Sequence, residues 1–254
     1  MALSNLKCGQ YISGAEVFSP ETTFDVLSPE TGSVVGTCPR GGAADAETAV
    51  AAARAGYNVW RALPPSARER VFLKAADIME ADIPRFENLL IDESGSVKGK
   101  AVFEAMYTVE ILRTAGGEAR RLYGETFPND KPNRMSIVIR EPVGVVAVVS
   151  PYNGPLILLA KMAIFALAAG NAVVAKPSEE TPMIAVELAK LMTEAGLPNG
   201  VFNILTGYGK EVGAPLCEHK DVNCIAFTGS TSVGAYLGSQ VSASFDELMC
   251  MLLP

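Results

Sequence analysis

The stretch Val143–Glu179, VGVVAVVSPYNGPLILLAKMAIFALAAGNAVVAKPSE, decides the fold that we expect for this chain. It begins with an apolar run, Val143–Val149, which turns abruptly at SPYNGP and continues as a helix-like segment, Leu156–Ala169. A second apolar run, Ala172–Ala175, ends on the polar sequence KPSE. The stretch therefore predicts a strand–helix–strand unit with polar groups at the carboxyl ends of both strands, where open α/β sheets bind their ligands.

The same alternation continues further along the chain. Strand-like runs lie at Val201–Leu205 and Asn223–Phe227, and helical segments are expected at Pro182–Ala195 and Lys210–Glu218. Strands that alternate with helices of this length imply right-handed crossovers and a parallel sheet. We therefore predict an α/β fold with a doubly wound, Rossmann-like parallel sheet and helices on both faces.

The amino-terminal part has a different pattern. Residues 1–42 are rich in glycine, proline, serine and threonine, and we expect short strands at Tyr11–Ile12, Thr23–Leu27 and Ser33–Thr37. Function is not visible in this part of the sequence.

Helices are expected from Ala44 onward, because apolar residues recur at helical spacing. We expect the first helix to end at Pro64-Pro65 and the next to begin with a capping box formed by Ser66 and Glu69. Pro84 should interrupt that helix, which resumes at Phe86–Glu93, and a long helix is expected at Val97–Leu122. Charged residues mostly stay exposed, so we expect a solvated face that includes Arg68, Arg70, Lys98 and Lys100.

A polar loop, Gly124–Pro132, precedes an alternating segment, Arg134–Glu141. Met135, Ile137 and Ile139 fall on one side of that segment, which predicts a strand with one face covered. Two roles remain open for it: an edge that pairs with another chain or domain, and an ordinary edge strand.

The composition limits the classes of function. The chain has 254 residues, of which 49% are hydrophobic and 19% charged, with a net charge of −7, so we expect a globular protein that binds neither nucleic acid nor an acidic membrane. Its 5 cysteines include no C-x-x-C pair, and with a single histidine, His219, we expect no metal site. The start lacks an apolar core of signal-peptide length, and Leu156–Ala169 is too short for a membrane span, so we expect a cytoplasmic protein.

Four motifs at strand ends could carry chemistry, and each has an ordinary alternative. Gly229–Gly234 and Gly207–Gly213 follow strands and begin helices, as phosphate and dinucleotide sites do, but they could also be simple turns. Lys176–Glu179 could hold a ribose and favour NAD over NADP, or form a surface ion pair. Asn153 could donate to a developing oxyanion, or merely form a turn.

Together the four motifs resemble the aldehyde dehydrogenase superfamily. The matching pieces are SPYNGP (Ser150–Pro155), AGNAVVAKPSE (Ala169–Glu179), LPNGVFNILTGYG (Leu197–Gly209) and FTGSTSVG (Phe227–Gly234). A weaker likeness extends back to about Tyr11, so that the resemblance covers most of the chain.

The resemblance implies a role for individual residues. Asn153 would help form the oxyanion hole, Lys176 and Glu179 would hold the adenosine ribose, and Ser230 would meet the pyrophosphate. NAD is the implied cofactor, with NADP disfavoured. The remaining cofactor-binding residues implied are Ser150, Tyr152, Ser178, Gly209, Gly213, Phe227, Thr228, Gly229, Val233 and Gly234, with Gly209 and Gly213 on the adenine side.

The resemblance also implies a division of the chain. Residues 1–133 would pack on the cofactor domain, 134–142 would form an oligomerisation arm, 143–238 would bind the dinucleotide, and 239–254 would be a divergent tail.

The likeness ends after Gly238. The family's Glu-Leu-Gly-Gly segment with its general base and its loop with a nucleophilic cysteine have no match here. Cys250 lies in an apolar run, and Cys217 and Cys224 are expected to be core or loop thiols, because a reactive thiol needs an electropositive, accessible setting.

We therefore expect a shortened NAD(P)-dependent aldehyde dehydrogenase that carries the cofactor-binding half and shows little activity alone. Its aldehyde would bind only with the missing domain, and it could form a homo-oligomer. Two alternatives stay open: a non-catalytic NAD-binding or regulatory subunit that pairs with a full-length relative through Arg134–Glu141, and a structural remnant without a ligand.

Overall fold

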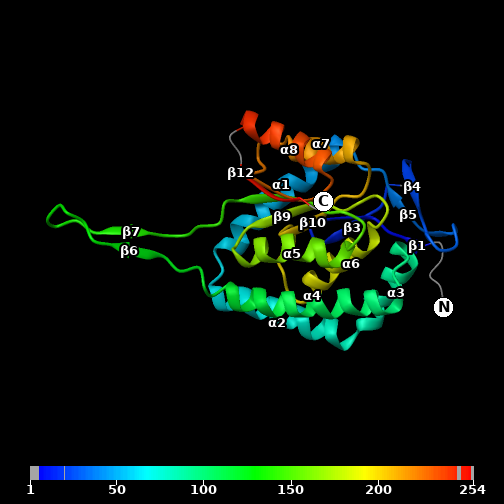
Figure 1. Cartoon of the computed structure of the whole chain (residues 1–254), viewed down its shortest axis with the longest axis horizontal. Coiled ribbons are helices and arrows are strands. Elements are labelled where there is room, and N and C mark those ends of the chain that lie inside the picture. The colour runs from blue at the N-terminus through cyan, green and yellow to red at the C-terminus, as the bar shows by residue number, and fades with distance from the viewer. Residues whose placement is uncertain (1–5, 20, 245–246, 253–254) are drawn as a thin grey trace.

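A parallel sheet forms the centre of the molecule. The computed structural model describes the backbone of residues 6–19, 21–244 and 247–252 and, within these ranges, the side chains up to residue 241. The sheet is 7-stranded, in the order β12-β11-β8-β9-β10-β2-β3 (Figure 1). Its parallel strands are β8 (Val145–Val149), β9 (Ala172–Lys176), β10 (Phe202–Ile204), β11 (Cys224–Gly229) and β12 (Glu247–Leu252).

These parallel strands follow the Rossmann arrangement. The chain builds β8, β9 and β10 outward in one direction, then returns to place β11 on the other side of β8, with β12 beyond it. This reversal defines a doubly wound sheet. The predicted fold class is therefore confirmed, although β10 is shorter than the expected Val201–Leu205 and β11 ends two residues later than expected, at Gly229.

The amino-terminal strands extend the structure at one edge. β2 (Gln10–Ile12) and β3 (Ala15–Val17) continue the central sheet in antiparallel orientation beside β10, while β1 (Leu6–Lys7), β5 (Val34–Pro39) and β4 (Thr23–Leu27) form a small second sheet. The short strands expected from the sequence are thus confirmed.

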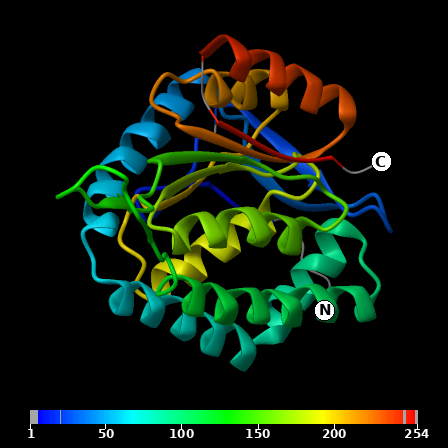
Figure 2. The same ribbon diagram turned by 60° about the vertical axis from the view of Figure 1, so that its left-hand side comes forward.

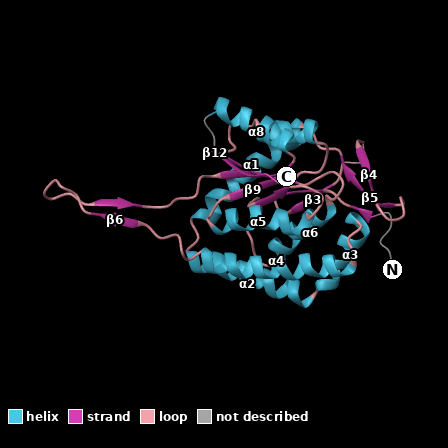
Figure 3. Cartoon of the chain, viewed as in Figure 1, coloured by secondary structure: helices cyan, strands magenta, loops and turns pink. Residues whose placement is uncertain are grey.

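Helices cover both faces of the central sheet (Figures 2 and 3). Face one carries α5 (Pro155–Ala168) and α6 (Met183–Glu194), with an outer layer of α2 (Pro65–Ala81), α3 (Ile83–Ser94) and α4 (Lys98–Glu118). Face two carries α1 (Ala43–Arg61), α7 (Ala214–Cys217) and α8 (Thr231–Ser244).

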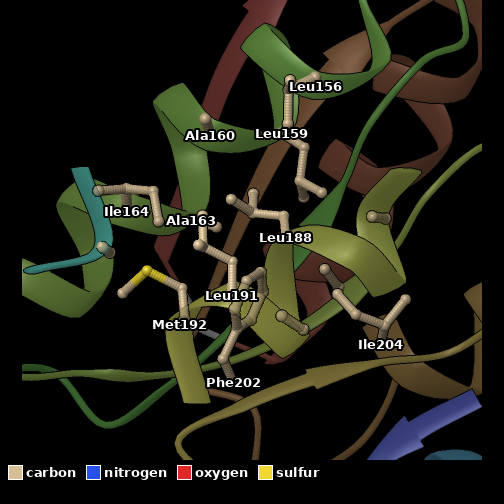
Figure 4. Packing of buried hydrophobic residues seen from close by; sticks show 14 of the residues in the cluster. Leu156, Leu159, Ala160, Ala163, Ile164, Leu188, Leu191, Met192, Phe202 and Ile204 are labelled. Atoms are coloured by element: carbon tan, nitrogen blue, oxygen red, sulfur yellow. The ribbon is translucent and has the colours of Figure 1, made fainter. Parts of the chain in front are cut away.

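Alternation along the strands separates two apolar cores. Val146 and Val148 of β8 pack with the helices of face one, whereas Val145 and Ala147 pack with those of face two. This is the two-residue period of a strand that is buried on both sides. Figure 4 shows α5 and α6 packed against β10 in the first core, with labelled side chains from all three elements.

Several helix ends differ from the prediction. The expected capping box is wrong, because α2 begins at Pro65 with Pro64 as its N-cap and no side chain caps it. The interruption expected at Pro84 lies two residues earlier, at Asp82, and Pro84 falls in the first turn of α3, where proline lacks an N–H that would be unpaired anyway. The long helix α4 ends at Glu118, directly after two glycines, rather than at Leu122.

Arg68 was expected on a solvated face, and that expectation is wrong. Its side chain is buried, and its Nη1 donates a hydrogen bond to the carbonyl of Leu63 at 2.9 Å. The cause is helical spacing, because Val71, Phe72 and Ala75 follow it on the inward face of α2. Burial lowers the pKa of Arg68. Arg70 and Lys98 are exposed as predicted, whereas Lys100 is only partly exposed.

The segment Arg134–Glu141 is half of a hairpin. Only Ser136–Val138 forms a strand, β7, and it pairs with β6 (Glu125–Phe127), which lies in the stretch predicted to be a polar loop. The hairpin projects from the body of the molecule (Figure 1). Met135, Ile137 and Ile139 are 75%, 60% and 69% exposed, so the prediction that one face is covered is wrong for the chain by itself.

Among the described residues, none of the helices is long and apolar enough to cross a membrane, and no group of histidine, cysteine and acidic side chains could hold a metal ion.

Candidate functional site

A pocket of about 690 Å³ lies at the carboxyl ends of β8, β9 and β11. These strands flank the place where the strand order reverses, between β8 and β11. The loops that leave β8 and β11 diverge to opposite faces there, which opens a crevice for ligands. The pocket thus lies where the sequence placed its polar motifs.

Ser150 forms the wall at the end of β8. Its backbone N–H donates to the carbonyl of Lys176 at 3.3 Å, which joins the ends of β8 and β9. Its Oγ is buried and has no hydrogen-bond partner among the described residues. A buried hydroxyl without a partner is costly, so this atom is suited to a polar ligand.

Lys176 and Glu179 form an ion pair at the end of β9. Nζ of Lys176 lies 3.0 Å from Oε2 of Glu179, and the two side chains are 5% and 35% exposed. Burial opposes ionisation of Glu179, but the charge of Lys176 and the hydrogen bonds to the carboxylate together hold the pKa of Glu179 below its usual value. The pair is therefore a charged, half-buried group on the pocket wall and not the surface ion pair that the sequence also allowed.

The motif Gly207–Gly213 does not begin the single helix predicted at Lys210–Glu218. Gly209–Gly213 form one π-helical turn, and α7 follows as one short turn of α-helix. A Cβ at Gly213 would lie 3.5 Å from Cδ of Lys176, an ordinary contact distance, so this turn packs directly against the lysine stem. Cys217 also lines the pocket, and burial raises the pKa of its thiol to about 12, which keeps it protonated.

The glycine-serine motif joins β11 to α8. β11 ends at Gly229, and Oγ of Ser230 accepts the backbone N–H of Val233 at 3.5 Å. A Cβ at Gly229 would lie 2.6 Å from Cζ of Phe227, so only glycine fits without a shift of that ring. The start of α8 therefore faces the pocket through Ser230, Ser232 and Val233.

The structure brings most of the predicted cofactor residues together, although their role in binding stays a prediction. The predicted residues that line the pocket are Ser150, Lys176, Ser178, Glu179, Gly209, Gly213, Phe227, Thr228, Gly229, Ser230 and Val233. Tyr152 and Gly234 do not line it: Tyr152 is 61% exposed, and Gly234 is buried in α8. Asn153 is exposed in the loop between β8 and α5, outside the pocket lining.

Sequence analysis missed two buried carboxylates behind these loops. Glu104 of α4 accepts backbone N–H groups at the start of α5, and Glu93 of α3 does so at the start of α6. Helical spacing was the sequence signal that could have revealed their burial. Glu104 shares a face with Ala101 and Thr108, and Glu93 shares one with Phe86 and Leu89.

Comparison with known proteins agrees with this geometry. The Aldehyde dehydrogenase family model matches residues 17–252. Among curated proteins, Glutarate-semialdehyde dehydrogenase of Pseudomonas aeruginosa is 37% identical over 94% of this chain and 50% of its own length. Phenylacetaldehyde dehydrogenase of Pseudomonas fluorescens is 39% identical over 94% of this chain and 49% of its own length.

Solved structures give the same result. A NAD-dependent aldehyde dehydrogenase from Sinorhizobium meliloti superposes with a TM-score of 0.92 and 36% identity, over 96% of this chain and 49% of that one. The NAD+ complex of an aldehyde dehydrogenase from Bacillus cereus has a TM-score of 0.94 and 31% identity, over 97% and 51% of the two chains. The chain thus spans about half the length of the relatives it matches.

Proposed function

Because the chain belongs to the aldehyde dehydrogenase family, we propose that its pocket binds NAD and forms the cofactor-binding part of a site that oxidises an aldehyde to a carboxylic acid. The observation that carries the proposal is the charged pair Lys176–Glu179, which lines a pocket at the reversal point of a doubly wound sheet. The Bacillus cereus relative was solved with NAD+ bound, which supports the choice of ligand.

The residues at the pocket fit such a cofactor. Lys176 and Glu179 offer a cation and a carboxylate to the ribose hydroxyls, and Ser230 and the start of α8 face the place where a pyrophosphate would lie. Ser150 adds a buried hydroxyl in need of a partner. When bound, the cofactor would accept a hydride from the substrate.

Glu179 favours NAD over NADP in this proposal. Its pKa is held below the usual value, so it is ionised at neutral pH. An ionised carboxylate accepts hydrogen bonds from ribose hydroxyls but repels a 2′-phosphate. Lys176 next to it reduces that repulsion without removing it.

Asn153 is the catalytic residue that we propose within the described part of the chain. Its exposed amide, at the start of α5, would donate to the oxyanion that forms when a thiolate attacks the aldehyde. The four cysteines whose side chains are described are all buried, and we assign the thiolate to none of them. The side chain of Cys250 is outside the described residues. We also assign the general base to no residue of this chain.

The partners that we propose are an aldehyde and a second copy of the chain. Apolar side chains on β7 and beside it are exposed, and such an edge is suited to pairing with another chain. A cytoplasmic location stays a prediction.

Titration calorimetry tests the cofactor proposal. We expect wild-type protein to bind NAD more tightly than NADP, and Lys176→Met to weaken NAD binding by about tenfold because a charge-assisted hydrogen bond is lost. Glu179→Gln should weaken NAD binding and reduce the preference over NADP. Glu180→Gln is the matched control, because Glu180 is the exposed neighbour that does not line the pocket. Absence of binding at millimolar NAD would refute the proposal.

A further inference from the structure

The two helices that follow the ligand loops of β8 and β9 have no side-chain cap of their own. The N-cap residue of α5 is Gly154, and that of α6 is Pro182. Neither residue has a side-chain oxygen that could accept the first free N–H groups of its helix. These groups are buried and must find acceptors elsewhere.

For α5 the acceptor is Glu104 of α4. Its Oε2 accepts the N–H groups of Leu156 at 3.3 Å and Ile157 at 3.4 Å, and its Oε1 accepts from Nζ of Lys100 at 2.6 Å. Pro155 has no N–H, and Leu158 donates to the carbonyl of Gly154 at 2.9 Å. The first turn of α5 is therefore fully paired, and two of its donors depend on Glu104.

For α6 the acceptor is Glu93 of α3. Its Oε1 accepts the N–H of Met183 at 2.5 Å, and its Oε2 accepts that of Ile184 at 3.0 Å. The side chain is 1% exposed. A carboxyl group at such depth needs hydrogen-bond partners, and here the amino-terminal end of a helix provides two donors.

Each capped helix is joined directly to one ligand loop. Asn153 precedes the N-cap of α5 by one residue. Before α6, the N–H of Thr181 donates to the carbonyl of Ser178 at 3.2 Å. The N–H of Glu180 donates to Oγ of Ser178 at 3.3 Å. A tight turn thus connects Glu179 to the start of α6, and a displaced helix end would carry its loop along.

We propose that Glu104 and Glu93 are positioning residues, each of which caps a helix from a neighbouring helix and thereby fixes one ligand loop. Glu104 fixes the loop of Asn153, and Glu93 fixes the turn that carries Glu179. The assignment of these loops to catalysis and to NAD rests on the proposed function. The capping and its local effect on each loop do not depend on it.

Hydrogen exchange without cofactor separates local positioning from general stability. The variants are Glu104→Gln and Glu93→Gln, which keep the shape but leave one acceptor oxygen, and the control is Glu110→Gln, an exposed glutamate on the same helix as Glu104. We expect Glu104→Gln to raise exchange about fivefold in residues 150–160 only, and Glu93→Gln to do so in residues 178–188 only, since a lost cap costs about that factor. Equal increases in both segments, or none, would overturn the proposal.

A local cap should rescue Glu104→Gln. Gly154 has φ −152°, outside the left-handed region that favours glycine, and a Cβ there would meet only side-chain atoms, the nearest being Cγ2 of Ile157 at 3.3 Å. The hydroxyl introduced by Gly154→Ser can accept from Leu156 or Ile157, the N–H groups that Glu104 serves. We expect the double variant to recover wild-type exchange in residues 150–160. Failure to recover, in a folded protein, would contradict the role of Glu104.

NAD calorimetry on the same proteins links the caps to the site. We expect Glu93→Gln to weaken NAD binding about fivefold, in line with the lost cap, and Glu104→Gln and Glu110→Gln to change it much less. If NAD binds wild-type protein and Glu93→Gln binds it equally well, Glu93 does not position the ribose-binding turn. If wild-type protein does not bind NAD, the proposed function fails, whereas the exchange patterns still decide whether the two glutamates hold their loops.

Discussion

Glu93 should make the stability of this protein fall as pH rises. The carboxyl group is buried between α3 and the start of α6, and burial raises its pKa from 4.5 to about 8, although the N–H groups of Met183 and Ile184 oppose that shift. The thiol of Cys38 is a nearby ionisable group, and its own pKa is raised by a hydrogen bond to Cys8 and by burial, so it stays neutral. The perturbation that isolates the effect is Glu93→Gln, which is neutral at every pH.

The sign follows from proton binding. Between pH 4.5 and about 8 the folded state holds the Glu93 proton and the unfolded state releases it. The free energy of unfolding therefore decreases with pH, by at most about 1.4 kcal/mol per unit. Across the whole interval, wild-type protein should lose roughly 5 kcal/mol relative to Glu93→Gln.

Urea unfolding at a series of pH values from 5 to 9 measures this loss. Trp60 is the only tryptophan, it is fully buried, and its Nε1 donates to the carbonyl of Leu167, so its fluorescence reports the folded core. We expect the difference in unfolding free energy between variant and wild type to grow in favour of the variant as pH rises. A constant difference would refute the reasoning. A difference of opposite sign would show that the helix end and its N–H groups lower the pKa despite burial.

Two further predictions concern a tight backbone approach and the projecting hairpin. Gly144→Ala should destabilise the fold by about 3 kcal/mol, because φ is +131° and a Cβ would lie 2.1 Å from Oδ1 of Asn223, whereas Gly99→Ala, in open space on α4, should be neutral or mildly stabilising in the same thermal unfolding assay. Ile137→Ser combined with Ile139→Ser should abolish self-association in analytical ultracentrifugation while leaving the melting temperature of the monomer unchanged, because both side chains are exposed in the single chain.

The sheet was predictable because each strand carries its own signal. The run Val145–Val149 is apolar on both faces, and so is Ala172–Lys176 up to its last residue. This pattern excludes a strand that has one solvent-exposed face. Polar residues that follow such runs must lie at one edge of a parallel sheet, so Ser150 and Lys176 could be placed side by side from sequence alone. The hydrogen bond from Ser150 N–H to the Lys176 carbonyl agrees with that placement.

What sequence could not give are the contacts made between elements. The burial of Arg68 depends on which face of α2 meets α4 and α6, and the sequence does not distinguish a cation on that face from a cation on the exposed face. The same holds for the carboxylates of Glu93 and Glu104, whose acceptor role requires knowing where α5 and α6 begin in space. β6 was missed because its three residues are exposed and too few to show an apolar alternation, and only pairing with β7 defines it as a strand.

These buried carboxylates also bear on where an anion can bind. The N–H groups of Leu156 and Ile157 are taken by Glu104, and those of Met183 and Ile184 by Glu93, so these donors at the starts of α5 and α6 are not free for an anion. An anion at either place would have to displace a buried carboxyl group and leave it without its hydrogen-bond donors, which costs free energy. The start of α8 differs, because its first-turn residues line the pocket and the group next to them is the Ser230 hydroxyl. Under the proposed function, the pyrophosphate of NAD would therefore meet free donors at the start of α8, because the two internal caps occupy the other two helix ends.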